Sequence, residues 1–357
     1  MALGMKVVWS DRCLLHDPEA EIWIGVRTDA AEVPARATAI RDALTAEGAT
    51  VVEASEHPDD AFLRVHEPAL VEYLRRAWQD WAEAGLPVEP GQDRVVPYVF
   101  AHASLTPGRK AHVPTAVWAR PGYFAYDTMT LVGPGTWEAA RAAADAALTA
   151  VDHVVAGDTC AYACTRPPGH HACRDCHGGS CYLNNAAIAA AALLDAGSGT
   201  VGVLDLDAHH GNGTQEIFSE RSDVPVGSVH VDPGAGWFPH FLGFADEVGV
   251  GAGEGANRNV PLAPGSGDGE WLDAVGSLAR WMHDAKPDAL VLALGVDAAE
   301  GDPESPLRVT PRGFRSAGQL VGALGLPTVI VQEGGYDLPR LGGLVLEFLL
   351  GFEEAGP

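Results

Sequence analysis

The sequence predicts a single α/β domain in which helices cover both faces of a mainly parallel β-sheet. Short apolar runs bounded by Gly, Pro and Asp recur along the chain, and Ala-rich stretches of helical length separate them. Runs that are apolar at successive positions are typical of strands buried on both faces, and strands that alternate with helices form parallel sheets. No internal repeat or low-complexity linker divides residues 1–357 into separate domains.

The expected elements follow this alternation in chain order. Strands are predicted where the apolar runs lie, at residues 6–9, 50–54, 201–207, 226–231, 289–296 and 327–332. Helices are predicted between them, at residues 34–47, 67–84, 136–156, 185–196, 269–285 and 311–324. A long insertion, residues 85–126, departs from the pattern because it is rich in Pro and Gly. Loops of that length in a compact domain usually serve a function or form an interface.

The charge balance excludes several classes of partner. The 357 residues include 23 Lys and Arg against 48 Asp and Glu, which gives a net charge of −25. We expect no binding to nucleic acid, because phosphates require a basic surface, and no docking on an anionic membrane. A negative field instead favours cationic ligands. With no secretory signal and no apolar run near the ~18 residues of a membrane span, the sequence predicts a cytoplasmic protein with reduced cysteines.

Ionisable side chains gather where the predicted strands end. In open parallel sheets, ligands bind beyond the carboxyl ends of the strands, so side chains delivered there by several strands indicate an active site. Any one of them alone could be a solvated polar residue, but the whole set is unlike a chance distribution. The set comprises Asp205, Asp207, His209, Asp297 and Tyr336, preceded by His170 and His171 in a Pro/Gly loop.

Three of these residues suit a catalytic metal. Asp207 and His209 lie two apart on an extended segment, so their side chains point the same way. Asp297, after another strand, would complete an Asp-His-Asp set. Three protein ligands that leave positions open are typical of a catalytic site. The ligand types favour Zn²⁺ but are compatible with Fe²⁺, Mn²⁺ or Co²⁺.

The order of the motifs resembles the zinc-dependent histone deacetylase family, class II-like. The resemblance rests on RPPGHHA, GGSCYLNNAAIAA, DLDAHHGNGTQ, LGVDAAEGDP and EGGYD, spread from 166 to 337. Within the family, GNGTQEIF and HFLGFADEVGVGAGEGANRNVPL look most like bacterial acetylpolyamine amidohydrolases. The resemblance implies the arginase/deacetylase-like fold, with an eight-stranded, mainly parallel sheet. It also implies a homodimer, because the 85–126 insertion matches the region that builds a dimer in those enzymes.

The resemblance implies a role for each matching residue. Asp207, His209 and Asp297 match the zinc ligands, and Tyr336 matches the tyrosine that binds the substrate carbonyl. The remaining positions match the proton-handling histidines His170 and His171, their partners Asp205 and Asn212, and a structural K⁺ site of Asp205, Asp207, His209, Ser228 and Val229.

Positions around the predicted tunnel bear on the substrate. Glu304 matches a rim glutamate that recognises a cationic amine in the polyamine deacetylase of the family, and Glu19 and Glu21 lie in HDPEAEI, a loop that would narrow the entrance. Ser180 stands where the family usually has an aromatic wall, so we expect a wider or more polar tunnel. The other expected contacts are Gly179, Phe238 opposite Ser180, and Asp127 at the rim.

The segment CRDCHGGSC is open to several interpretations. Cys173, Cys176, His177 and Cys181 could form half of a zinc site, and Cys173 and Cys176 could form a redox pair. Reduced thiols are the simplest interpretation in a chain without an export signal. A haem attachment is disfavoured on the same ground.

The sequence thus predicts a zinc amidohydrolase that releases acetate from N-acetylated polyamines or similar small cationic amines. A deacetylase of acetyl-lysine peptides is the first alternative. A ureohydrolase of the same fold would need a later Asp-x-Asp pair, which ValAspAlaAlaGlu lacks. An acylamine-binding protein without catalysis is the alternative of another class, and the intact ligand, His and Tyr set weighs against it.

Overall fold

A parallel sheet forms the centre of the computed structural model, which describes residues 3–87 and 94–356. Its eight strands follow the order β4-β1-β5-β10-β9-β6-β7-β8, and every neighbouring pair is parallel. The predicted fold class is therefore confirmed. The strands are β1 (Lys6–Trp9), β4 (Thr50–Glu53), β5 (Cys160–Ala163), β6 (Val201–Asp205), β7 (Val226–Val231), β8 (Asn257–Leu262), β9 (Ala289–Leu294) and β10 (Thr328–Gln332).

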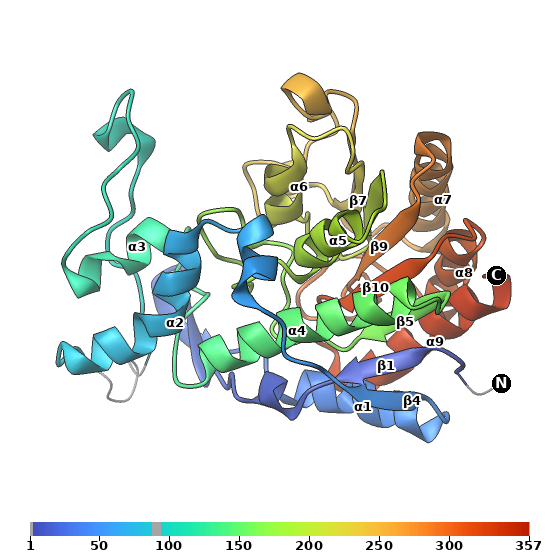
Figure 1. Cartoon of the computed structure of the whole chain (residues 1–357), viewed down its shortest axis with the longest axis horizontal. Coiled ribbons are helices and arrows are strands. Elements are labelled where there is room, and N and C mark those ends of the chain that lie inside the picture. Colours follow the sequence, from blue (N-terminus) through green and yellow to red (C-terminus); the bar gives the residue numbers. More distant parts are fainter. Residues whose placement is uncertain (1–2, 88–93, 357) are drawn as a thin grey trace.

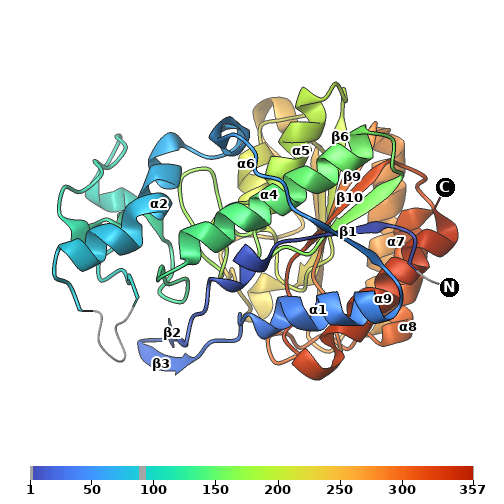
Figure 2. The ribbon, with the colours of Figure 1, turned by 60° about the horizontal axis from the view of Figure 1, so that its bottom comes forward.

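Helices cover both faces of this sheet, as Figures 1 and 2 show. Alternate residues of one strand face opposite sides, so Val203 packs in one core and Leu204 in the other. One core includes α2 (Pro68–Glu83), α4 (Thr136–Val155), α5 (Asn185–Asp195) and α6 (Asn212–Phe218). The opposite core includes α1 (Ala35–Ala46), α7 (Asp268–Ala285), α8 (Pro311–Gly322) and α9 (Leu338–Ala355).

Several elements differ from the sequence prediction. Strand β8 contains Pro261 and polar residues, which an edge strand tolerates but which hid it as an apolar run. The sequence does not predict helix α9, because the segment contains several glycines, which disfavour helices. At Gly351 a Cβ would lie 2.0 Å from the Arg315 carbonyl oxygen, so glycine is required where α9 packs against α8. Elements β5 and α6, the short α3 (Pro121–Phe124) and the antiparallel hairpin of β2 (Ala20–Trp23) and β3 (Val26–Asp29) were also not predicted.

The predicted 85–126 insertion forms an arm, defined here as residues 94–126, that extends away from the sheet (Figure 1). Residues 88–93 of the insertion, and residues 1, 2 and 357 of the predicted domain, lie outside the described residues. The arm exposes large apolar side chains, including Tyr98 at 71%, Leu105 at 70% and Trp118 at 51%. Among the described residues, no helix is long and apolar enough to cross a membrane.

Candidate active site

The predicted site residues meet beyond the carboxyl ends of the central strands. Strands β6, β9 and β10 are neighbours in the sheet, and their ends deliver Asp207, Asp297 and Tyr336 respectively. Because these strands are parallel and adjacent, residues 39 to 129 positions apart in the sequence converge on one edge. The Pro/Gly loop between β5 and α5 adds His170 and His171.

Asp207, His209 and Asp297 form a compact cluster. One ligand-type atom from each lies within 4.8 Å of the others. The His209 Nδ1 atom is 3.2 Å from Asp207 Oδ1 and 3.1 Å from Asp297 Oδ2. Burial, followed by the charge of Asp207, raises the pKa of Asp297 to about 7. Two buried carboxylates this close to an imidazole constitute an environment that a divalent cation would stabilise.

Gly334 allows the strand ends to approach one another closely. Its backbone N–H donates to Asp207 Oδ2 at 2.7 Å, and a Cβ at this position would lie 2.3 Å from Asp297 Oδ2. Asp297 Oδ1 in turn accepts the backbone N–H of Ala208 at 2.8 Å. These bonds hold both carboxylates beside His209, and fixing the ligands in this way is the usual role of the residues around a metal site.

The two histidines have different partners and different charge preferences. His170 Nδ1 lies 2.9 Å from Asp205 Oδ2, while His171 Nδ1 lies 2.7 Å from the amide oxygen of Asn212. Burial opposes charging of His170, but the Asp205 and Asp207 carboxylates outweigh it and raise its pKa to about 10. Burial, reinforced by His170, lowers the pKa of His171 well below its usual value. His171 is therefore the neutral ring of the pair.

Tyr336 is held by residues that the sequence analysis did not assign. Its backbone N–H donates to Asp302 Oδ2 at 2.8 Å, and the Arg36 guanidinium lies 4.5 Å from the ring centroid. Arg36 Nε also donates to the Gly335 carbonyl at 2.6 Å. Burial raises the pKa of Tyr336 well above its usual value, so the phenol keeps its proton. A lone arginine in a helical stretch gives no signal in the sequence, whereas Asp302 stood within the quoted LGVDAAEGDP motif.

These side chains lie at one pocket with a volume of about 1320 Å³. His171, His209 and Tyr336 belong to its lining, together with aromatic residues of the arm and of the β2–β3 hairpin. The lining residues that bear on substrate shape and charge are Glu21, Trp23, Phe100, Asp127, Gly179, Ser180, Phe238 and Glu304.

Acidic residues gather at the pocket. Glu21 and Glu304 both line it, and burial, followed by the charges of Glu304 and Asp127, raises the pKa of Glu21 to about 7. Asp127 lines the pocket, but its Oδ2 already accepts the Gly179 N–H at 2.6 Å. Glu19, two residues before Glu21, is exposed and does not line the pocket.

The walls of the pocket are unlike one another. Phe238 packs its ring against His171, with the ring centroids 4.8 Å apart. Ser180 lines the pocket as predicted, with φ at 62°, and its backbone N–H donates to the Thr130 hydroxyl at 2.8 Å. The pocket therefore combines an aromatic surface from Phe238 with hydroxyl and carboxylate groups around Ser180.

The residues predicted for a monovalent cation come from adjacent strands. Asp205 and Ser228 are direct partners in the β6–β7 pairing, and Val229 follows in β7. The Ser228 hydroxyl lies 2.8 Å from His230 Nδ1. The structure thus places Asp205 beside Ser228 on adjacent strands, and Asp205 also contacts His170.

The cysteines of the CRDCHGGSC segment are free thiols. Cys173 Sγ lies 3.7 Å from the side-chain nitrogen of Asn212, and the Cys173 N–H donates to the Cys176 carbonyl at 2.9 Å. Cys181, His170 and Glu333 each offer one possible metal-ligand atom within 4.8 Å of the other two. None of these three residues lines the pocket.

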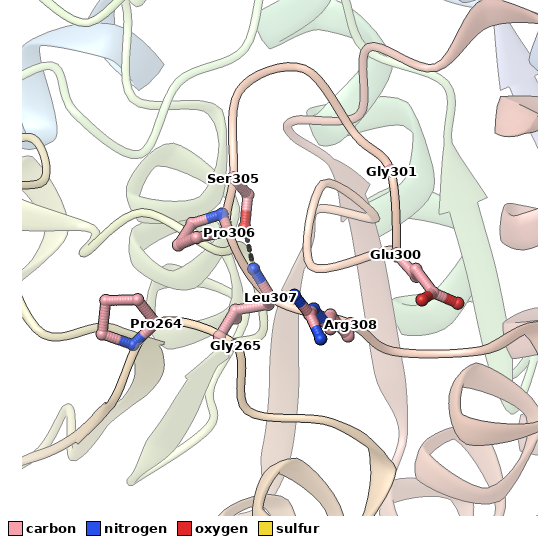
Figure 3. Close-up of a pocket in the computed structure, with 8 residues that line it drawn as sticks. All are labelled: Pro264, Gly265, Glu300, Gly301, Ser305, Pro306, Leu307 and Arg308. Carbon is pink, nitrogen blue, oxygen red and sulfur yellow. Dashed lines mark hydrogen bonds between the residues drawn. The ribbon is translucent and has the colours of Figure 1, made fainter.

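A smaller hollow of about 410 Å³ lies on the loop that carries Glu304 (Figure 3). Glu300, Gly301 and Ser305 line it, and Figure 3 shows the chain curling from Gly301 to Leu307. It shares no lining residue with the larger pocket.

Comparisons with known proteins agree on one family. Residues 30–351 match the histone deacetylase domain family. The chain is 40% identical to acetylpolyamine amidohydrolase 1 of Pseudomonas aeruginosa over 352 residues, 98% of this chain and 99% of that one. It is 38% identical to acetylpolyamine amidohydrolase of Mycoplana ramosa over 350 residues, 97% and 99% of the two chains. A crystal structure of acetylpolyamine aminohydrolase from Burkholderia pseudomallei superposes with a TM-score of 0.93 at 38% identity, covering 99% of this chain and 100% of that one.

Proposed function

Because the chain belongs to the histone deacetylase family, we propose that it is a metal-dependent amidohydrolase that releases acetate from N-acetylated polyamines or similar small cationic amines. The observation that carries the proposal is one pocket that contains both the His171, His209 and Tyr336 side chains and the carboxylates of Glu21 and Glu304. The full-length similarity to acetylpolyamine amidohydrolases supports the same substrate class.

The donor set of Asp207, His209 and Asp297 fits a divalent cation. One imidazole and two carboxylates suit Zn²⁺, with Fe²⁺ and Co²⁺ as the alternatives. When bound, such an ion would polarise the acetamide carbonyl and lower the pKa of a water molecule. We also propose that a structural K⁺ binds at Asp205, Asp207, His209, Ser228 and Val229, which the register of β6 and β7 supports.

The remaining side chains would handle protons and the developing charge. A neutral His171, oriented by Asn212, can accept a proton from the attacking water and pass it to the departing nitrogen. His170, oriented by Asp205, assists as the charged partner of the pair. The neutral phenol of Tyr336 can donate a hydrogen bond to the oxyanion that forms from the carbonyl.

Replacing Glu304 by Leu is expected to reduce selectivity for polyamines. A substrate with its amide beside Tyr336 would leave a second, charged nitrogen near Glu304. Two unit charges ~4 Å apart interact by roughly 1 kcal/mol in water and about 4 kcal/mol at an effective dielectric of 20. Glu304→Leu should therefore lower kcat/KM for acetylpolyamines about ten- to a few hundredfold and change it little for acetyl-lysine peptides.

The measurement compares acetylputrescine, acetylcadaverine, acetylspermidines and acetyl-lysine peptides in both proteins. Glu300→Leu is the matched control, because Glu300 lies on the same loop but at the other hollow (Figure 3). An unchanged ratio of polyamine to peptide turnover in Glu304→Leu would mean that this carboxylate is only a solvated loop residue. Higher salt should weaken the wild-type preference, because the pair is partly exposed.

We further propose that the protein is a cytoplasmic homodimer. The exposed apolar side chains of the arm favour an interface there, and Phe100 of the arm lines the pocket, so pairing at this surface would restrict its mouth. The double substitution Tyr98→Glu, Leu105→Glu should shift sedimentation equilibrium toward a monomer. Val155→Glu alters an exposed apolar residue at the end of α4, outside the arm, and should leave the mass unchanged. A wild-type chain that sediments as a monomer at micromolar concentration would contradict the proposal.

A further inference from the structure

Asp302 belongs to the loop that follows β9, two residues before Glu304, and bonds both within this loop and to the segment that follows β10. Its side chain is buried, with 5% exposed. The Oδ2 atom accepts the backbone N–H groups of Tyr336 at 2.8 Å and Asp337 at 3.2 Å. The Oδ1 atom accepts the backbone N–H of Glu304 at 3.0 Å. One carboxylate therefore joins the segment that follows β10 to the loop that follows β9.

The position of the Tyr336 phenol depends on these backbone anchors. On one side, Arg36 holds the Gly335 carbonyl at 2.6 Å and stacks on the ring. Gly335 has φ at 127°, a conformation that only glycine adopts readily, so the chain turns sharply just before the tyrosine. On the other side, Asp302 fixes the N–H of Tyr336 itself. A shift of this carboxylate would move the phenol relative to the Asp207–Asp297 cluster.

The Glu304 loop is also held by backbone bonds at its base, where the Glu300 N–H donates to the Val309 carbonyl and the Arg308 N–H to the Ser266 carbonyl. Beyond it the chain curls past Ser305, whose hydroxyl accepts the Leu307 N–H at 3.2 Å, around the hollow of about 410 Å³ (Figure 3). Arg340 also links the two segments, because its Nη1 atom donates to the Glu300 carbonyl and to Asp337 Oδ2. Among the described residues, however, Asp302 is the side chain that bonds to the backbone N–H groups of both Glu304 and Tyr336.

We propose that Asp302 is a positioning residue that sets the distance between the rim carboxylate of Glu304 and the phenol of Tyr336, and thereby selects substrates by chain length. This inference rests on the proposed function. A monoacetylated diamine that bridges the two groups fits only when its methylene chain matches their separation. The carboxylate that fixes both backbones makes that separation narrow, so one chain length is favoured over its neighbours.

Asp302→Asn is the direct test. An amide presents one acceptor and one NH₂ donor, so either the Tyr336 and Asp337 N–H groups or the Glu304 N–H must face a donor. We expect kcat to fall about tenfold, and the kcat/KM values of monoacetylated diamines with three to six methylenes to converge to within about twofold. Asp268→Asn is the matched control, because Asp268 accepts the Thr310 N–H at 2.8 Å away from the pocket. A variant that loses thermal stability but keeps the wild-type chain-length profile would overturn the proposal.

Double-mutant cycles separate positioning from a general structural role. If Asp302 acts through Tyr336, then Asp302→Asn should change kcat less than about twofold once Tyr336→Phe is present. If it acts through Glu304, it should not change the chain-length profile of Glu304→Leu. If Asp302→Asn has the same effect in the Tyr336→Phe and Glu304→Leu backgrounds as in the wild type, the proposed coupling is overturned.

A third cycle leaves Asp302 in place, in case its variants do not fold. Tyr336→Phe combined with Glu304→Leu should have a non-additive effect on kcat/KM for acetylated diamines, and additivity would again overturn the coupling. Assays of the wild-type protein distinguish a failure of the proposed function from a failure of the role of Asp302. Absence of turnover on every acetylated amine would refute the proposed function itself, whereas a fully active wild type with additive cycles would refute only the role of Asp302.

Discussion

Asp297→Ala is expected to abolish both bound divalent metal and turnover. Asp297 is fully buried, and its Oδ2 atom lies 3.1 Å from His209 Nδ1, so its loss removes one of the three donors at the centre of the site. Two remaining protein ligands would bind a divalent ion too weakly to retain it through purification. The measurement is metal content by mass spectrometry, with about one ion per chain in the wild type and none in the variant, alongside kcat on acetylputrescine.

Asp288→Ala is the matched control for this prediction. Asp288 lies just before the amino end of β9, whereas Asp297 lies beyond the carboxyl end of the same strand. Its carboxylate accepts the N–H groups of Gly199 and Thr200 at 2.8 and 3.0 Å, so its loss tests the cost of removing a hydrogen-bonded aspartate next to this strand. Full activity of a chelated wild-type preparation that retains no metal would refute the metal-dependent reaction.

Tyr336→Phe is expected to lower kcat by about 10²–10³ while leaving substrate binding less affected. The phenol is neutral because burial raises its pKa, and it would donate most strongly to the oxyanion rather than to the ground-state carbonyl. The ring should stay in place, since Arg36 stacks on its face and Asp302 holds the backbone. The loss should therefore appear in kcat more than in KM.

Tyr162→Phe provides the comparison for Tyr336→Phe. Tyr162 is a fully buried tyrosine of β5 whose hydroxyl donates to Gln332 Oε1 at 2.7 Å, outside the pocket. Its substitution should cost stability on the order of 1 kcal/mol but leave kcat per folded molecule near the wild-type value. Should Tyr336→Phe behave like Tyr162→Phe, the phenol does not take part in the reaction.

The sequence predicted the convergence of the site because the parallel-sheet rule depends on the backbone alone. Once the runs before Asp207 and Asp297 are recognised as parallel strands, their ends must meet at one edge, whatever the side chains do. Family motifs added His171 and Tyr336, and the structure brings both to the same pocket as His209.

What the sequence could not predict depends on tertiary packing. Arg36 lies in a helix remote in sequence from Tyr336, and only the folded chain brings its guanidinium to the tyrosine ring. Glu19 and Glu21 were grouped as one entrance loop, but the short strand β2 begins between them and only Glu21 reaches the pocket. Asp302 lies within the LGVDAAEGDP motif, but it contacts Tyr336 only when two loops are folded against each other, so the motif alone does not reveal its role.

The raised pKa of Glu21 implies that substrate capture is linked to proton release. Burial and the charges of Glu304 and Asp127 raise the pKa of Glu21 from its usual 4.5 to about 7. Between these two pH values, the folded chain without substrate therefore holds a proton on Glu21 that the unfolded chain has already lost. The stability that this group contributes therefore falls as pH rises through that window. An ammonium beside Glu21 favours the ionised carboxylate and expels the proton. Affinity for a cationic amine consequently rises with pH up to about 7 and levels off above it, as the proton and the amine compete for one carboxylate.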